Sequence, residues 1–244
     1  MNILNMRGSF LFFLFSFFCM ITGNFHHYLL FLSLILIHEC GHAFCAKILG
    51  WNLKEIVLYP FGGVTVIEDK INKPMKEELL ILLAGPIAQI LYYLLFYKHL
   101  PVSFSFFHHY LLLFNLLPIY PLDGGKILNL CYQSIFPFLF SHKILIFSSF
   151  FFLLSATIFL HSFLFLLSFL FLGIQIVEEK RKEPFLYEKF LLERTFYSFS
   201  FPFVKKIKGI HLNKMYRDHL HFFYNGKIWI HEKEILKKKY FLKK

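Results

Sequence analysis

The hydrophobic residues of this chain lie in long, nearly continuous runs, unlike the alternating or one-faced patterns of a soluble domain. Six runs are candidate membrane crossings, although some are shorter than the roughly 20 residues that a crossing usually needs. They cover Ser9–Thr22, Tyr28–Leu49, Leu79–Tyr97, Phe104–Leu117, Ile144–Leu160 and Ser162–Val177. The first run lacks a small-residue cleavage site behind it, so we treat it as a retained helix. The pattern predicts an all-α polytopic membrane protein with six transmembrane helices.

Two segments depart from this pattern. Residues 51–69 place β-branched runs around a Pro-Phe-Gly-Gly turn, which predicts a small membrane-associated β-hairpin. The hairpin is either an interfacial loop or an edge that receives an extended substrate by strand addition. In the tail, Asn225-Gly226 between apolar strands predicts a second hairpin. We therefore expect a transmembrane domain over residues 1–177 and a short α+β cytosolic tail over residues 178–244.

Composition and charge support a membrane protein and orient it. The chain is 57% hydrophobic and only 17% charged. With six crossings and a cytoplasmic N-terminus, Lys98 is the loop cation that falls outside, and both termini are cytoplasmic. The cations that then fall inside, as the positive-inside rule favours, are those of the tail together with Arg7, Lys47, Lys54, Lys70, Lys73, Lys76, Lys126 and Lys143. The four cysteines form no CxxC pair and indicate no disulfide scaffold.

The tail is strongly basic, with 17 Lys and Arg against 8 Asp and Glu after residue 177. A polybasic cytosolic segment next to a membrane is expected to lie against anionic lipid headgroups. Nucleic-acid binding would need a recognisable module, and the tail contains none, so we expect no nucleic-acid partner.

A His-Glu-x-x-His motif, His38 to His42, interrupts the second apolar run. At about 100° per residue, its two histidines point about 40° apart on one helix face, which suits two nitrogens on one zinc ion. Glu39 flanks that face and can reach a metal-bound water, whereas Cys40 points away and is expected to be a packing residue. Ionisable groups are costly at membrane depth and mark function by default. The motif thus favours a metal site over histidines bonded to backbone carbonyls.

A catalytic zinc ion normally has three protein ligands and a water, so the histidine pair requires a third ligand. The chain has three aspartates. Asp123 lies in the stretch at the inner end of the fourth run, in the same half of the membrane as the motif, whereas Asp69 follows the hairpin and Asp218 lies in the tail. Asp123 is therefore the best candidate.

The residues before Asp123 are unusual for a membrane span. Pro118 and Pro121 must interrupt the helix, which at membrane depth is tolerated only around a protein-lined or watery cavity. We expect Gly124-Gly125 to form a tight turn. Asn115 either bridges helices, a common use of buried amides, or steadies the substrate or an oxyanion.

Taken together, the His38–His42 motif and the stretch Asn115–Gly125 resemble the site-2 protease family of intramembrane zinc metalloproteases. The segment Phe190–Arg194, with the sequence FLLER, is most similar to the family's sporulation branch. The resemblance implies one Zn²⁺ as cofactor and a general-base carboxylate beside it. It assigns the metal ligands to His38, His42 and Asp123, the general base to Glu39, and an active-site position to Asn115.

The resemblance also implies an activity, namely intramembrane zinc metalloendopeptidase, and a membrane-associated protein substrate. In the sporulation branch the substrate is a sigma-factor precursor, membrane proteins inhibit or regulate the enzyme, and the site of action is the bacterial mother-cell membrane around the forespore. The alternatives are a general site-2 protease that cuts anti-sigma factors or signal-peptide remnants, a metal transporter, and a non-catalytic membrane metal-binding scaffold. The tail is too short for the complete CBS regulatory domain of that branch, so we expect a truncated CBS-like module.

Overall fold

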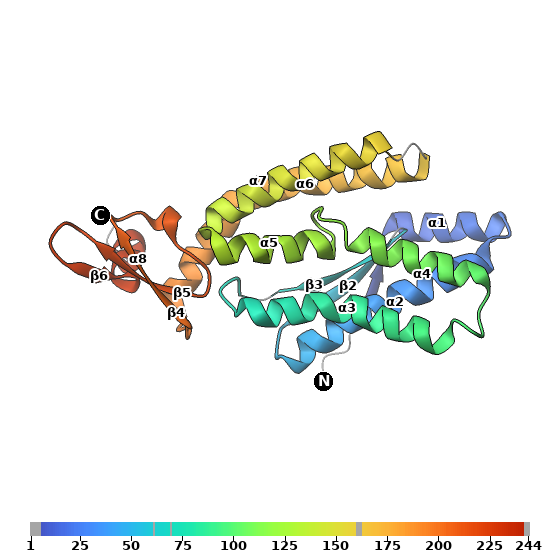
Figure 1. Ribbon diagram of the computed structural model, residues 1–244, viewed down its shortest axis with the longest axis horizontal. Coiled ribbons are helices and arrows are strands. Elements are labelled where there is room, and N and C mark those ends of the chain that lie inside the picture. Colours follow the sequence, from blue (N-terminus) through green and yellow to red (C-terminus); the bar gives the residue numbers. More distant parts are fainter. Residues whose placement is uncertain (1–5, 61, 69, 160–162, 242–244) are drawn as a thin grey trace. The chain divides into compact units, whose positions relative to one another are not determined.

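The computed structural model describes residues 6–60, 62–68, 70–159 and 163–241, with side chains 158–168 excepted (Figure 1). These residues form mainly helices, with two small sheets. The chain divides into two compact units. The first comprises Met1–Asp69 and Glu77–Leu117, and the second comprises Lys70–Lys76 and Pro118–Lys244.

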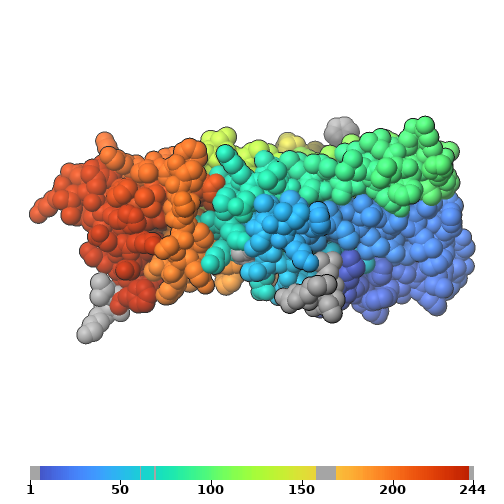
Figure 2. Space-filling view, turned by 90° about the horizontal axis from the view of Figure 1, so that it is seen from below, coloured from blue at the N-terminus to red at the C-terminus, as the bar shows by residue number. Residues whose placement is uncertain are grey.

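The first unit contains helices packed beside a three-stranded sheet (Figure 1). Buried aliphatic and aromatic side chains join α2 to α4 and to the sheet, among them Leu34, Phe104 and Ile56. Figure 2 shows the blue surface of α2 beside the turquoise surface of α3 and the green surface of α4. The elements are β1 (Met6–Gly8), α1 (Phe10–Ile21), α2 (Phe25–Ile48), β2 (Leu53–Tyr59), β3 (Gly62–Ile67), α3 (Met75–Phe96) and α4 (Val102–Asn115).

The hairpin expected within residues 51–69 is present as β2 and β3, which pair antiparallel. The sequence did not predict β1, which pairs parallel with β2 and makes the strand order β1-β2-β3. The three residues of β1 precede an apolar run and carry no strand signal of their own. Their extended conformation is explained by pairing with β2. In this sheet β2 is the central strand, and β3 therefore has one edge that pairs with no described strand, which we call its free edge.

Three described helices are long and apolar enough to cross a membrane, namely α2, α3 and residues Phe138–Thr157 of α6. In each, only 28–39% of the most apolar 18-residue window is buried inside the protein. Such helices expose many Leu, Ile and Phe side chains, which is unfavourable in water and favourable in lipid. The protein is therefore an integral, multi-pass membrane protein.

The first, fourth and sixth expected crossings are not among these three helices. Helix α1 has 12 residues and α4 has 14, which at 1.5 Å per residue is shorter than the roughly 30 Å hydrocarbon core. The expected fifth span ends at Leu160 and the sixth starts at Ser162, and both residues lie outside the described part of the chain. A six-crossing topology remains a prediction.

The second unit contains the paired helices α6 and α7 and a small α+β tail (Figure 1). The tail sheet has the order β4-β5-β6, and the expected Asn225-Gly226 turn joins β5 to β6, with the Asn225 side chain accepting bonds from two backbone N–H groups. The elements are α5 (Asp123–Ile135), α6 (Phe138–Phe159), α7 (Phe163–Phe196), β4 (Phe203–Lys208), a 3₁₀ turn (Leu212–Lys214), β5 (His219–Tyr224), β6 (Trp229–His231) and α8 (Glu232–Phe241).

The prediction of a tight turn at Gly124-Gly125 was wrong. Asp123, Gly124 and Gly125 form the first turn of α5, with Leu122 as the N-cap residue. A Cβ on Gly125 would lie 2.5 Å from the carbonyl carbon of Ile119. The glycine is therefore needed for close approach to the preceding backbone rather than for a left-handed turn.

The tail is organised by a buried cation, Arg194 of α7. Its guanidinium donates to the Glu232 carboxylate at 3.1 Å, to the carbonyls of His219 and Tyr216 at 2.8 Å, and to the side chain of Asn72 at 2.6 Å. Burial lowers the pKa of Arg194 to about 10, and the charge of Glu232 opposes this shift. Buried charges need such complete pairing.

Segment 70–76 is fixed to the same network. The neighbouring Glu193 carboxylate accepts bonds from the backbone N–H groups of Ile71 and Asn72, each at 3.1 Å. Arg217 donates to the carbonyl of Lys73 at 2.9 Å, and Asp218 accepts from the N–H of Met75 at 3.2 Å. These bonds explain why segment 70–76, far away in the sequence, belongs to the second unit.

We predict that the tail loses stability as the pH falls below about 6.5. Neutral His221 donates from Nδ1 to Glu232 and accepts the Tyr216 N–H at Nε2. Burial lowers the pKa of His221, so in acid the unfolded chain binds a proton that the folded chain resists, and the proton favours unfolding. Hydrogen exchange of the 215–224 peptide, corrected for intrinsic rate, should be faster at pH 5.5 than at pH 7.5.

His221→Asn should weaken this pH dependence, because the new side chain does not titrate. The exposed His211 serves as the matched control, and His211→Asn should retain the full effect. Equal protection of the peptide at both pH values would contradict the assignment.

Candidate metal centre

The two motif histidines lie one turn apart on α2 and both are buried. Their rings meet nearly at right angles, and the two Nε2 atoms are 3.1 Å apart. Since apolar residues surround the motif in the helix, water offers the imidazoles little compensation there. The structure confirms that the helical spacing of the motif brings two ring nitrogens to one point.

The other nitrogen of each ring has a fixed partner on α3. His38 Nδ1 lies 3.0 Å from Gln89 Oε1, and His42 Nδ1 lies 2.7 Å from the carbonyl oxygen of Ile81. The amide of Gln89 is itself oriented, because its nitrogen donates to the carbonyl of His108 at 3.0 Å. Both partners are acceptors, so both histidines carry their proton on Nδ1.

It follows that the two Nε2 atoms present lone pairs to each other, and two lone pairs cannot form a hydrogen bond. A cation shared by both nitrogens resolves the conflict. Two nitrogens bound to a tetrahedral zinc at about 2.0–2.1 Å lie about 3.3–3.4 Å apart, close to the observed 3.1 Å. Orientation of metal-binding histidines by a second hydrogen bond is the usual arrangement around zinc.

Two glycines allow α2 and α3 to approach this closely. A Cβ on Gly85 would lie 2.2 Å from His42 Nε2, and a Cβ on Gly41 would lie 2.6 Å from the carbonyl oxygen of Ala84. Helix α3 therefore approaches α2 closely at Gly85, and the missing side chain makes the space for the His42 ring.

Glu39 points from α2 to the hairpin. Its Oε2 accepts a hydrogen bond from Thr65 Oγ1 of β3 at 2.7 Å, and a Cβ on Gly63 would lie 2.5 Å from its side chain. The carboxylate is buried. The hairpin thus both leaves room for Glu39 and orients it beside the histidine pair.

Asn115 ends α4 next to the same point. Its Nδ2 atom lies 3.5 Å from His38 Nε2, the nitrogen that faces the shared cation position. Its amide links α4 to α2 and lies within reach of a group bound at that position.

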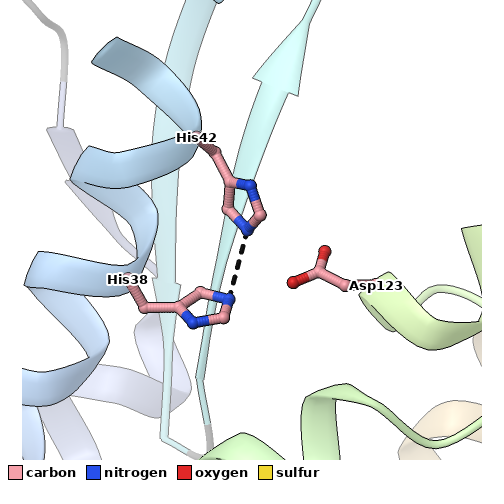
Figure 3. Close-up of side chains that lie close together, drawn as sticks. All are labelled: His38, His42 and Asp123. Carbon is pink, nitrogen blue, oxygen red and sulfur yellow. Dashed lines mark hydrogen bonds between the residues drawn. The ribbon is translucent and has the colours of Figure 1, made fainter. Parts of the chain in front are cut away.

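Asp123 supplies the third donor. One carboxylate oxygen and one nitrogen from each histidine lie within 4.8 Å of one another, and all three residues are buried (Figure 3). Two imidazoles and a carboxylate are a donor set of catalytic zinc sites. Asp218 instead bonds Met75 in the tail network, and Asp69 lies outside the described residues.

Sequence reasoning missed Gln89, Thr65 and the carbonyl of Ile81. Gln89 had a readable signal, since it is an amide within an otherwise apolar run. Thr65 had none, because threonine is an ordinary strand residue.

Comparisons with known proteins agree with this centre. The profile of peptidase family M50 matches residues 27–109. The chain is 35% identical to stage IV sporulation protein FB of Bacillus subtilis over 191 residues, which are 72% of this chain and 66% of that protein. It is also 35% identical to a zinc metalloprotease of Methanocaldococcus jannaschii over 48% of this chain and 37% of that protein.

A solved structure, the site-2 protease from Methanocaldococcus jannaschii, superimposes with a TM-score of 0.56 at 25% identity. The match covers 73% of this chain and 93% of that one. The chain spans just under two thirds of the sporulation protein's length and a smaller part of the archaeal relative's.

Fold and site together define a membrane-embedded metalloprotein of the HExxH type. The chain belongs to peptidase family M50, the site-2 proteases, which are intramembrane zinc metalloproteases. The cluster of His38, His42 and Asp123 is its site for one zinc ion.

We predict that Gln89→Leu lowers zinc affinity by about 10- to 100-fold, because His38 loses the acceptor that fixes its tautomer. Gln89→Glu keeps an acceptor at the same place and should bind zinc more tightly than Gln89→Leu. Competition with a chromogenic chelator in detergent measures both affinities, and equal affinities for the leucine and glutamate variants would refute the role of Gln89.

Proposed function

We propose that this protein is an endopeptidase that cleaves a membrane-associated protein at or near the cytosolic membrane face. The observation that carries the proposal is the buried Glu39 carboxylate, held by Thr65 beside the histidine pair. A structural metal site has no need of an oriented carboxylate that is not a ligand. This feature argues against a non-catalytic scaffold. Among the described residues the possible metal ligands gather in one cluster, which argues against a transporter.

In the proposed mechanism His38, His42 and Asp123 hold the ion. When bound there, a zinc ion would supply Lewis-acid chemistry: it would polarise the scissile carbonyl and lower the pKa of a water toward about 7. Glu39 accepts the proton of the attacking water and delivers it to the leaving amine. The Asn115 amide donates a hydrogen bond to the oxygen that becomes negative during the reaction.

The hairpin offers a place for the substrate backbone. A helical substrate hides its peptide carbonyls in hydrogen bonds, so it must unwind before cleavage, and its freed backbone groups need partners in lipid. The free edge of β3 provides such partners by strand addition. Since Thr65 and Gly63 of the same strand contact Glu39, a strand bound there would pass close to the general base.

For the particular substrate, the similarity to a stage IV sporulation protein supports the precursor of a sporulation sigma factor. We propose both termini in the cytoplasm, six crossings, a mother-cell membrane location around the forespore, and inhibition by membrane proteins. Anti-sigma factors or signal-peptide remnants are the alternative substrates of a general site-2 protease.

We also propose that the tail contacts anionic lipid. Strand β4 exposes Lys206 and Lys208 together with the apolar Phe203 and Val204. Cations beside exposed apolar groups suit the headgroup region of a membrane.

We predict that Glu39→Gln abolishes cleavage, by at least about 100-fold, while membrane insertion and zinc content stay unchanged, because Glu39 is not a ligand. The assay co-expresses the enzyme with epitope-tagged, membrane-tethered substrates: a sigma-factor precursor, an anti-sigma factor and a signal-peptide remnant. Glu55→Gln, a carboxylate on β2 that pairs with Arg7, is the matched control and should stay active. Full activity of Glu39→Gln would remove Glu39 from the chemistry, and cleavage of the anti-sigma factor alone would favour the general protease.

A further inference from the structure

A buried polar cluster in the second unit includes Tyr120, which lies in the turn just before Asp123. Tyr120 Oη donates to Glu179 Oε2 of α7 at 2.9 Å, and the backbone N–H of Tyr120 donates to Ser149 Oγ of α6 at 3.0 Å. Ser149 has no exposed surface and Glu179 is 9% exposed. The proposed function leaves both residues unused, although a buried carboxylate in an apolar helix pair is costly.

The turn itself is short and stiff. The N–H of Leu122 bonds the carbonyl of Ile119 at 2.9 Å, which closes a β-turn over residues 119–122. Leu122 is at once the N-cap of α5, and its carbonyl accepts the N–H of Lys126. The chain therefore passes from the turn into the helix without a flexible residue between Tyr120 and Asp123.

Close packing joins the turn to the first turn of α5. The α carbon of Gly125 sits so near the backbone of Ile119 and Tyr120 that a side chain there would collide with it at 2.5–2.6 Å. A shift of Tyr120 must therefore move the start of α5, and Asp123 is the first residue of that helix.

The anchors come from two different helices. Ser149 holds the backbone of Tyr120, and Glu179 holds its side chain, so the residue is fixed at both ends. On α6, His142 and Ser149 are seven residues apart and share a face. His142 Nε2 is buried 3.8 Å from Glu179 Oε1 and has no hydrogen-bond partner among the described residues.

We infer that Glu179 and Ser149 are positioning residues for the zinc ligand Asp123, acting through Tyr120. Asp123 is the first residue of α5 and follows Pro118 and Pro121, so no helix or strand directly before it fixes the orientation of its side chain. Tyr120 supplies that orientation by linking the turn to α6 and α7. This inference rests on the proposed function only where it concerns cleavage. The effect of Glu179 and Ser149 on metal binding is measurable without a substrate.

The test uses the full-length protein in detergent, depleted of metal and titrated with Co²⁺, whose visible spectrum reports ligand number and geometry. Tyr120→Phe removes one hydroxyl and preserves the ring. We expect about tenfold weaker Co²⁺ and Zn²⁺ binding and a changed visible absorption band. Glu179→Leu should give the same loss.

Three comparisons separate positioning from general damage. Glu179→Gln keeps an acceptor for the tyrosine hydroxyl and should bind metal within about twofold of the unchanged protein, since the interaction requires an acceptor and not a charge. The exposed neighbour Glu178 is the matched control, and Glu178→Leu should have no effect. The Tyr120→Phe, Glu179→Leu double variant should be no weaker than either single variant, because both remove one interaction.

Each outcome decides the question. Metal affinity and spectrum unchanged in Tyr120→Phe and Glu179→Leu would overturn the inference, as would additive losses in the double variant. If a leucine variant fails to fold, the single variants Tyr120→Phe and Ser149→Ala provide the same test. Ser148→Ala is then the control and should leave metal binding unchanged. Normal metal binding with no cleavage of any substrate would instead count against the proposed function and leave the positioning role standing.

Discussion

The structure of the site depends on one constraint: the Nε2 lone pairs of His38 and His42, both on the apolar helix α2, point at each other. Each ring has its proton held on Nδ1 by an oxygen of α3, so the two Nε2 atoms face each other at 3.1 Å without a proton between them. This arrangement is unfavourable on its own and becomes favourable around a cation. Many features of the first unit are requirements for building it.

Those requirements explain residues that otherwise look unrelated. Glycines at positions 41 and 85 let α2 and α3 approach until the His42 ring reaches the Ile81 carbonyl. Gln89 is oriented by a backbone carbonyl of α4 before it can orient His38. The hairpin approaches from the other side and orients Glu39 through Thr65. The histidine pair and the Glu39 carboxylate are thus oriented by separate elements.

Much of this could be predicted from the sequence, and the reasons are physical. The motif histidines have helical spacing, and ionisable groups in an apolar run stand out, so His38, His42, Glu39 and the candidate Asp123 were identifiable. Both hairpins carried strong turn signals and were confirmed. The number of crossings was harder, because helices of 12 and 14 residues are apolar without being long enough to span.

The errors and omissions share a cause. Gly124-Gly125 suggests a turn when only local propensity is considered, yet the N-cap at Leu122 and close packing on Ile119 place both residues in a helix. Thr65, the Ile81 carbonyl and β1 matter only through partners distant in the sequence. Local patterns identify the groups that perform chemistry, whereas the groups that orient them are defined by tertiary contacts.

The most direct test of the account is zinc-edge X-ray absorption of the purified protein in detergent. We expect one zinc per chain with two imidazole nitrogens and carboxylate or water oxygens at about 2.0–2.1 Å, and loss of the imidazole signal in His38→Ala. A sulfur shell at about 2.3 Å, which would mean a cysteine ligand, or a metal retained after replacement of both histidines, would contradict it.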